Sequence, residues 1–340
     1  MKNQEYQRIE NLVNNFRGRR IAIFGDLMLD RYIKGSVRRI SPEAPVPVVL
    51  VKSESFVCGG ASNVAVNLAA LSGKPVIISV CGQDEPSEFL EHILKDSGVD
   101  TSYLVRDKKY PTIEKIRVLA ENQQIVRVDK EAPERMTPSA RAKALNALQK
   151  AVGDGCETVI LSDYGKGLFD YHTIRKAIEI ARNAGLPVFV DPKIDHFQHY
   201  KGVTCITPNT AEAFGGMRQT RRDDQQSAEK LGKKILSRLG CETLIITQGE
   251  HGLTLFNPKN AASPVTHIPT KAREVFDVSG AGDTVIATLA IASAAGAIPE
   301  EAAKIANFAA GVVVGKLGTA TLTPQELLEH AEFCCRTADI

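Results

Sequence analysis

A turn of small residues is bracketed by two carboxylates in the segment Asp277-Val278-Ser279-Gly280-Ala281-Gly282-Asp283, and the apolar run 284–294 follows at once. This order predicts a loop, a tight turn and a helix. Glycines at 280 and 282 let the backbone curl so that successive N–H groups point at one spot. Because the helix dipole favours negative charge there, Gly280, Ala281 and Gly282 form a candidate anion hole.

Asp283 would stand in the first turn of that helix, beside the bound anion. A carboxylate and an anion repel each other, so structure alone explains this arrangement poorly. It makes sense if the carboxylate removes a proton from a hydroxyl that attacks a phosphorus atom. For an isolated Gly-Ala-Gly-Asp, an Asp that caps free amides would be the better explanation. The motifs elsewhere in the chain reverse that preference and make Asp283 a candidate catalytic base.

Other polar residues and glycines follow predicted strands. Asp26 ends the first strand after a glycine, with Asp30 four residues on, and either carboxylate suits sugar hydroxyls or an Asx turn. Gly59 and Gly60 permit close approach of the backbone to a ligand, or form a plain turn before a helix. Asn63 offers both a donor and an acceptor.

Two further motifs are candidates for nucleotide binding. Asn209 and Glu212 open a helix three residues apart, where they form a capping box or orient water and Mg²⁺ around phosphates. Thr247, Gly249 and Gly252 make a strand end and a glycine-spaced turn, which holds an adenine nucleotide through its backbone or is simply a hairpin. The P-loop pattern and the protein-kinase motif set are both absent.

Two strand ends pair an acid with a lysine. They are Asp163-Tyr164-Gly165-Lys166-Gly167 and Asp191-Pro192-Lys193. An anionic sugar would require such pairs, but a surface salt bridge explains them equally well.

The elements that must position these residues alternate along the chain. Short apolar strands between helices predict an α/β fold with a mostly parallel sheet covered on both faces. Active sites in such sheets lie at the carboxyl ends of the strands. We expect strands at 21–24, 76–80, 158–161, 188–190, 203–206 and 244–247, and helices at 1–18, 62–71, 87–96, 138–152, 172–184, 223–239, 281–294, 300–314 and 324–333.

Two stretches break this alternation. Residues 46–53 and 112–129 read as alternating strands, the second as a hairpin turning near Glu121 and Asn122. They predict a small β lid, from about 31–57 and 105–130, on a single domain covering 19–335. A β flap of this kind exposes an apolar face that a second copy would bury, so we expect a homodimer through the lid.

Composition limits the class of protein. The chain has 340 residues, 43% hydrophobic and 24% charged, with a net charge of +2 and no basic tract, so we expect no nucleic-acid partner. Its seven cysteines are scattered without C-x-x-C spacing, which is typical of a reducing cytoplasm. The polar N-terminus is not a signal peptide, and no apolar run approaches the roughly 18 residues of a membrane span.

Taken in their order along the chain, the motifs resemble the ribokinase (PfkB-type) carbohydrate kinase family over residues about 18–328. The pattern is G-D near 26, G-G-x-x-N near 60, N-x-x-E at 209, T-x-G-x-x-G at 247 and D-x-x-G-A-G-D at 277, with Val278 in place of the usual Thr. The resemblance implies a ribokinase-like three-layer α/β/α fold with a β-strand lid. It also implies an ATP-dependent sugar-phosphate kinase.

The resemblance assigns roles as well. Asp283 is the base for a sugar hydroxyl, and Glu212 with Asn209 holds Mg²⁺ through water. Asp277 and Ser279 match positions that bind a monovalent cation such as K⁺, together with carbonyls near Lys316 and Gly318. Residues expected to hold the sugar are Asp26, Asp30, Gly59, Gly60, Asn63 and Lys193, with Arg117, Lys115, Arg38 and Arg39 as candidates for its phosphate.

Within the family, residues 38–48, 162–167 and 191–193 resemble the heptose 7-phosphate kinase branch. That branch phosphorylates the anomeric 1-hydroxyl of D-glycero-β-D-manno-heptose 7-phosphate to the 1,7-bisphosphate, for ADP-heptose and lipopolysaccharide synthesis. It is often fused to a nucleotidyltransferase, so we expect a kinase-only form or the kinase half of a fusion. The alternatives are fructose 6-phosphate, tagatose 6-phosphate, ribose or a nucleoside as substrate, or a catalytically inactive sugar-phosphate sensor. An aromatic content of 6% without Trp disfavours a nucleoside.

Overall fold

The computed structural model describes residues 2–121, 123–131, 136–222, 224–272 and 274–336. Three residues of the predicted elements lie outside these ranges: Met1 and Asp223, which begin two predicted helices, and Asn122 of the predicted hairpin turn.

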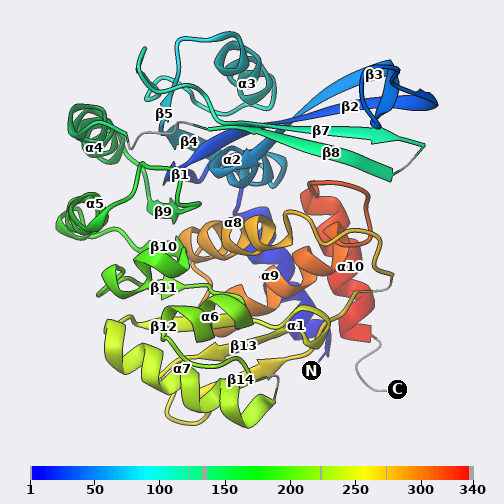
Figure 1. The fold of residues 1–340 in the computed structure, drawn as a ribbon. Helices are drawn as coiled ribbons and strands as arrows, with labels where there is room; N and C mark the ends of the chain where they lie inside the picture. The colour runs from blue at the N-terminus through cyan, green and yellow to red at the C-terminus, as the bar shows by residue number, and fades with distance from the viewer. Residues whose placement is uncertain (1, 122, 132–135, 223, 273, 337–340) are drawn as a thin grey trace.

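An eight-stranded sheet forms the centre of the molecule (Figure 1). The strand order is β14-β13-β12-β11-β10-β9-β1-β4, and every pairing from β4 to β12 is parallel. Strand β13 runs antiparallel to both of its neighbours, β12 and β14. The strands are β1 Arg20–Gly25, β4 Lys74–Ile78, β9 Thr158–Ser162, β10 Val188–Asp191, β11 Cys205–Ile206, β12 Thr243–Thr247, β13 Leu253–Phe256 and β14 Val265–Ile268.

Helices cover both faces of this sheet, which confirms the three-layer α/β/α fold (Figure 1). One apolar core contains side chains of α1 Lys2–Asn14, α2 Ala61–Ala70, α3 Glu85–Asp96, α8 Ala281–Ala294, α9 Pro299–Val313 and α10 Pro324–Arg336. The core on the opposite face contains side chains of α4 Pro138–Gly153, α5 Tyr171–Asn183, α6 Thr210–Gly216 and α7 Gln225–Leu239. In the described residues, no helix is long and apolar enough to cross a membrane.

Helix α8 is the element that carries the predicted base. It is apolar on all sides, and Ile286, Leu289 and Ile291 are among its fully buried side chains. A helix of this composition is stable only when neighbours surround it. Helices α2 and α9 pack against it in the same core, so its N-terminus is held rigidly beside the edge of the sheet.

The lid is a separate four-stranded sheet in the order β3-β2-β7-β8, which reaches beyond the core in Figure 1. Its strands are β2 Leu27–Ile40, β3 Pro47–Gly60, β7 Glu114–Ala120 and β8 Gln123–Lys130. Asp30 pairs with Lys115 and Tyr32 pairs with Arg117 in parallel register. Because alternate residues of a strand share a face, these four side chains lie on one face of the lid.

Several elements differ from the sequence prediction. Strand β2 was not among the predicted strands, although most of it lies within the predicted lid. Its partners β3 and β7 lie on its two sides in the lid sheet. Strands β13 and β14 were not predicted; they are short and form the edge of the sheet. The predicted strand 203–206 shrinks to β11, and the two-stranded pair β5 Val80–Cys81 and β6 Val105–Arg106 is additional.

Candidate functional site

Asp283 lies in the first turn of α8, as predicted, and is only 6% exposed. Its Oδ1 accepts a hydrogen bond from the Tyr164 hydroxyl at 2.6 Å, and its Oδ2 accepts one from Asn63 Nδ2 at 2.7 Å. Burial raises the pKa of Asp283 to about 6, the two hydrogen bonds oppose that shift, and the charge of Asp30 adds to it. A carboxylate that is half-ionised near pH 6 is a competent general base at neutral pH.

The turn that was predicted to form an anion hole lies directly before α8. Gly280 has φ +78°, in the left-handed region that favours glycine, and no side chain caps the helix. A Cβ at Gly280 would lie 2.8 Å from Asn63 Nδ2, so only glycine fits there. The Ala281 N–H donates to the Val278 carbonyl at 3.2 Å, within the turn.

Asp26 follows β1 and is 2% exposed. Its carboxylate accepts the backbone N–H groups of Tyr164, Lys166 and Leu168 at 3.0, 3.1 and 3.2 Å. Burial and then the nearby charge of Asp163 raise the pKa of Asp26 to about 6, and the three amides oppose that shift. Asp26 thus fastens residues 163–168, which we name the β9 loop, to the end of β1.

Asp163 is a buried member of the β9 loop. One carboxylate oxygen accepts the Tyr200 hydroxyl and is bonded to His196 Nδ1, both at 2.6 Å. The hydrogen bond to Asp163 raises the pKa of His196, against the effect of burial. Lys166, the lysine that the sequence placed beside Asp163, pairs instead with Glu131. Asp163 therefore holds its end of the β9 loop to the segment that contains His196 and Tyr200.

The charged face of the lid lies above the base. Asp30 bonds Arg117 Nη1 at 2.6 Å, and the Arg117 guanidinium stacks 5.2 Å from the centre of the Tyr32 ring. Burial lowers the pKa of Lys115, as do the positive charges of Lys166 and Arg117. A Cβ at Gly59 would lie 2.7 Å from Asp30 Oδ2, which explains glycine at that position. This face therefore carries the positive charges of Lys115 and Arg117 beside Asp30, and the charge of Asp30 reaches Asp283.

A second group of acids lies at the ends of β10 and α6. The pKa of Asp191 is raised well above its usual value by burial and then by the charges of Asp283 and Glu212, while Lys193 opposes the shift. Burial likewise raises the pKa of Glu212, and Lys193 opposes it. The charge of Glu212 thus reaches Asp191, and a hydrated divalent cation typically needs only one or two such carboxylates. Across the described residues, no three His, Cys, Asp or Glu side chains gather closely enough to hold a metal ion.

Asn209 and Glu212 form a capping box at the start of α6. Asn209 Oδ1 accepts the Glu212 N–H, and Glu212 Oε2 accepts the Asn209 N–H, both at 2.9 Å. Asn209 also forms a bridge with Thr247, at the end of β12. The capping box that the sequence offered as an alternative is thus present. It places Glu212, like Asp191, at the carboxyl ends of the parallel strands.

The turn after β12 has a structural explanation for one of its glycines. Gly249 and Gly252 both have positive φ, at +58° and +87°. A Cβ at Gly252 would lie 2.2 Å from the Ile268 carbonyl oxygen on β14, whereas the space around Gly249 is open. The turn joins β12 to β13, so the predicted hairpin alternative is also present.

Asp277 connects the loop before α8 to the loop after α9. Its Oδ1 accepts the Ser279 N–H at 2.9 Å and its Oδ2 accepts the Gly318 N–H at 3.1 Å. The Ser279 backbone bond is the main reason why the pKa of Asp277 is lowered. The structure therefore brings together the two segments predicted for a monovalent cation, and the cation itself stays a prediction.

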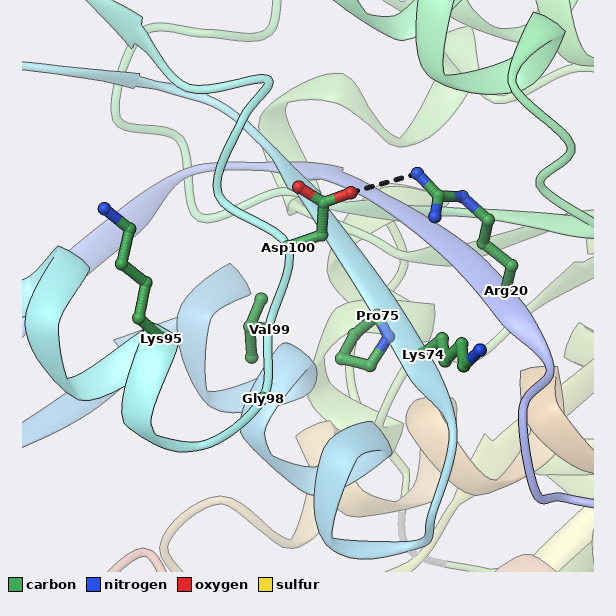
Figure 2. Close-up of a pocket in the computed structure, with 7 residues that line it drawn as sticks. All are labelled: Arg20, Lys74, Pro75, Lys95, Gly98, Val99 and Asp100. Atoms are coloured by element: carbon green, nitrogen blue, oxygen red, sulfur yellow. Dashed lines mark hydrogen bonds and ion pairs between the residues drawn. The ribbon is translucent and has the colours of Figure 1, made fainter.

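A cavity of about 320 Å³ lies at the opposite edge of the sheet (Figure 2). Arg20 and Lys74, which begin β1 and β4, line it together with Lys95 and Asp100, and Arg20 pairs with Asp100 at 3.0 Å. The parallel strands thus point away from this cavity, and it is separate from the site around Asp283.

The main contact that the sequence did not predict is Tyr164 to Asp283. In the pattern Asp-Tyr-Gly-Lys-Gly, the sequence analysis considered the acid and the lysine and assigned no role to the tyrosine. Two positive-φ glycines, at 165 and 167, bend the loop so that the phenol turns towards α8. A tyrosine between an acid and a glycine at a strand end was the available signal.

A buried carboxylate at the N-terminus of a helix, above the carboxyl ends of a parallel sheet and beneath a charged lid, defines the class of carbohydrate kinases with the ribokinase-like fold. Residues 19–326 match the pfkB family carbohydrate kinase, and the chain belongs to that family. It is therefore a sugar kinase by class.

Known proteins support this assignment. The chain is 45% identical over 307 residues to a "Bifunctional protein HldE" of Pseudomonas aeruginosa, which covers 90% of this chain and 62% of the relative. It is 42% identical over 329 residues to the protein of the same name from Geobacter sulfurreducens, covering 97% and 66%. The chain thus spans about two thirds or less of the length of these relatives.

Solved structures share the fold. Arabidopsis thaliana ribokinase complexed with ribose and ATP aligns with a TM-score of 0.73 at 19% identity, covering 92% of this chain and 99% of that one. Phosphofructokinase-2 from Escherichia coli in complex with potassium aligns with a TM-score of 0.77 at 17% identity, covering 93% and 99%.

Proposed function

We propose that this protein transfers the γ-phosphoryl group of ATP to the anomeric 1-hydroxyl of D-glycero-β-D-manno-heptose 7-phosphate, giving the 1,7-bisphosphate for ADP-heptose and lipopolysaccharide synthesis. The observation that carries the kinase chemistry is the buried Asp283 beside the Gly280 turn. The heptose assignment rests on the resemblance of residues 38–48, 162–167 and 191–193 and on the identity to the HldE proteins.

In the proposed reaction, the sugar hydroxyl oxygen attacks the γ-phosphorus, the bond from phosphorus to the ADP oxygen breaks, and the hydroxyl proton passes to Asp283. The N–H groups of Gly280, Ala281 and Gly282 stabilise the phosphoryl oxygens as charge shifts, once Ala281 releases the Val278 carbonyl. A loose transition state needs proton removal only late, so positioning and charge stabilisation account for most of the rate.

The nucleotide would lie along the ends of β11 and β12. Thr247, Gly249 and Gly252 offer backbone groups to it, and Asn209 with Glu212 would hold Mg²⁺ through water. The charge of Glu212 raises the pKa of Asp191, and two neighbouring carboxylates support a cation there. When bound, Mg²⁺ supplies positive charge to the ATP phosphates. A monovalent cation at Asp277 and Ser279 is a further part of the proposal.

The sugar would lie between α2, the β9 loop and the lid, with contacts from Asp30, Gly59, Gly60, Asn63 and Lys193. Arg117 and Lys115 on the lid face would bind its phosphate, whereas Arg38 and Arg39 are exposed near the lid tip. Asp26 already accepts three amides, so we give it the role of holding the β9 loop.

The test is ADP release from Mg-ATP, with K⁺ present, against heptose 7-phosphate, fructose 6-phosphate, ribose and adenosine. We expect turnover mainly on heptose 7-phosphate. Preference for another sugar would contradict the proposed substrate but leave the assignment of Asp283 as the base intact. Absence of turnover on all four compounds would favour the catalytically inactive sugar-phosphate sensor.

The same assay tests the phosphate contact. Lys115→Met should raise the KM for the sugar phosphate about tenfold, the typical effect of losing a hydrogen bond to a charged group. Lys34→Met, on the same lid face but exposed, is the matched control and should change the KM little.

We further propose that two copies of the chain pair through their lids. Large apolar side chains are exposed on the lid, namely Ile40, Val46, Leu50, Val51, Ile125, Val126 and Val128, and exposed apolar strands favour pairing with another chain. Sedimentation equilibrium should give twice the chain mass of 36.9 kDa, and Val126→Lys should shift the mass towards the monomer. A monomeric wild type at micromolar concentration would contradict this proposal.

A further inference from the structure

Both oxygens of Asp283 are already occupied in the sugar-free enzyme. Tyr164 donates to Oδ1 at 2.6 Å and Asn63 donates to Oδ2 at 2.7 Å, and the carboxylate is only 6% exposed. A hydroxyl that gives its proton to this base must approach to within roughly 2.6–3.2 Å of one oxygen. Each oxygen keeps a second lone pair, but the surface around it is nearly all covered. We therefore expect that a third donor reaches the carboxylate only when one of the two present donors moves away.

Asn63 is held by its neighbours in α2 and by Asp283. Asn67 Nδ2 donates to the Asn63 carbonyl at 2.9 Å and lies 3.4 Å from its Oδ1, and Thr284 Oγ1 donates to Asn67 Oδ1 at 2.8 Å. These contacts orient the Asn63 amide so that its Nδ2 points at Asp283. Both asparagines are buried, and Gly280 closes the remaining side. Asn63 is therefore the donor that stays.

Tyr164 is held differently. Its backbone N–H is fastened to Asp26, but the side chain is half-buried and its ring lies over Gly60, where a Cβ would come within 3.4 Å of Cδ2. The ring also packs against the core on the α4–α7 face of the sheet. The hydroxyl would leave Asp283 by rotation of the side chain. It also presents to Oδ1 the same O–H group that a sugar presents.

We propose that the Tyr164 hydroxyl occupies, in the sugar-free enzyme, the position on Asp283 Oδ1 that the acceptor hydroxyl of the sugar takes, and that sugar binding displaces it. The inference rests on the proposed role of Asp283 as the base. Until the sugar arrives, the tyrosine keeps water away from Oδ1, so the base activates no water against ATP.

Comparison of Tyr164→Phe with wild type tests the displacement. The variant has no bond to break, so heptose 7-phosphate should bind about tenfold tighter by calorimetry, the scale of one hydrogen bond to a charged group. The Tyr164 bond lowers the pKa of Asp283, so its loss should move the acidic limb of kcat/KM, which reports the free enzyme, to higher pH. The acidic limb of kcat should stay in place, because the tyrosine has already left in the complex. The phosphate of the sugar titrates equally in both enzymes and cancels.

A permanent positioning role for Tyr164 gives the opposite pattern. Both limbs would then move together, kcat would fall and binding would not tighten, and that result would overturn the inference. Tyr200→Phe is the matched control, because it removes a 2.6 Å bond from a buried tyrosine to a different carboxylate, Asp163. It should leave both acidic limbs in place.

A binding measurement separates this inference from the proposed function. The NMR signal of ¹³C-labelled Tyr164, assigned through the Phe variant, should shift when wild type is saturated with heptose 7-phosphate in the absence of ATP. An unmoved signal at saturation would overturn the displacement even if turnover is normal. A shifted signal without turnover would support the displacement and contradict the kinase assignment. Absence of both binding and turnover would overturn both.

Discussion

Asp283→Asn should lower kcat by roughly 10³-fold, because a positioned general base typically contributes 10²–10⁴ to the rate. The asparagine keeps the shape of the side chain. Its oxygen can accept from Asn63 while its NH₂ group donates to the Tyr164 hydroxyl, which can reverse its role. Binding of ATP and of the sugar phosphate should therefore survive within about threefold, a bound set by the small net worth of one hydrogen bond.

Asp170→Asn is the control for this change. Asp170 caps α5 through the Thr173 N–H, away from the site, and the same substitution there should leave kcat near the wild-type value. Near-normal turnover in Asp283→Asn would contradict the base assignment. Loss of sugar binding together with turnover would point to a folding defect instead.

The pH profile offers a second view of the same group. The base must be ionised to accept a proton, and burial raises its pKa to about 6. We therefore expect kcat/KM to fall tenfold per pH unit below about pH 6. In Asp283→Asn this limb should disappear from the residual activity.

Asp26→Ala should lower the free energy of unfolding by about 3–5 kcal/mol. Three backbone N–H groups of the β9 loop would lose their acceptor, and each buried group left without a partner costs about 1–3 kcal/mol. The sum is reduced because an ionised carboxylate in that buried position is itself unfavourable, as its raised pKa of about 6 indicates. Urea unfolding measures the change.

Asp170→Ala is the matched comparison, since it removes the acceptor of only one backbone amide, together with a partly exposed ion pair to Arg141. We expect a loss of about 1 kcal/mol there, the usual effect of losing an N-cap. Equal losses in the two variants would contradict the account of Asp26 as the anchor of the β9 loop. Because Tyr164 belongs to that loop, Asp26→Ala should also disturb the hydrogen bond from Tyr164 to Asp283.

The parts of the fold that follow simple patterns were predictable. The turn at Gly280 and the apolar run after it gave α8 its observed bounds, and the short β-branched runs gave the parallel strands. Strand β2 was not predictable in the same way, because the lid sheet has charged residues on one face and partly exposed residues on the other. Its pairing with β7, far along the chain, decides its structure.

The site was predictable in its residue types and less so in its contacts. Asp283, Asn63 and Gly280 do lie together, because short motifs mark the ends of elements that meet at one edge of the sheet. The sequence does not indicate which hydrogen-bond donor each carboxylate accepts from. Asp26 and Asp163 were indistinguishable from sugar ligands until their backbone and tyrosine partners were known.

The base and its two donors come from distant parts of the chain. Asn63 is 220 positions from Asp283, and Tyr164 is 119 positions away. Contacts between residues so far apart in sequence form slowly, because the entropy of closing a long loop is lost before the contacts contribute any stability. In a refolding experiment, helix content should therefore return well before phosphoryl transfer does. The rate at which activity returns would then measure how fast α2 and the β9 loop dock onto α8.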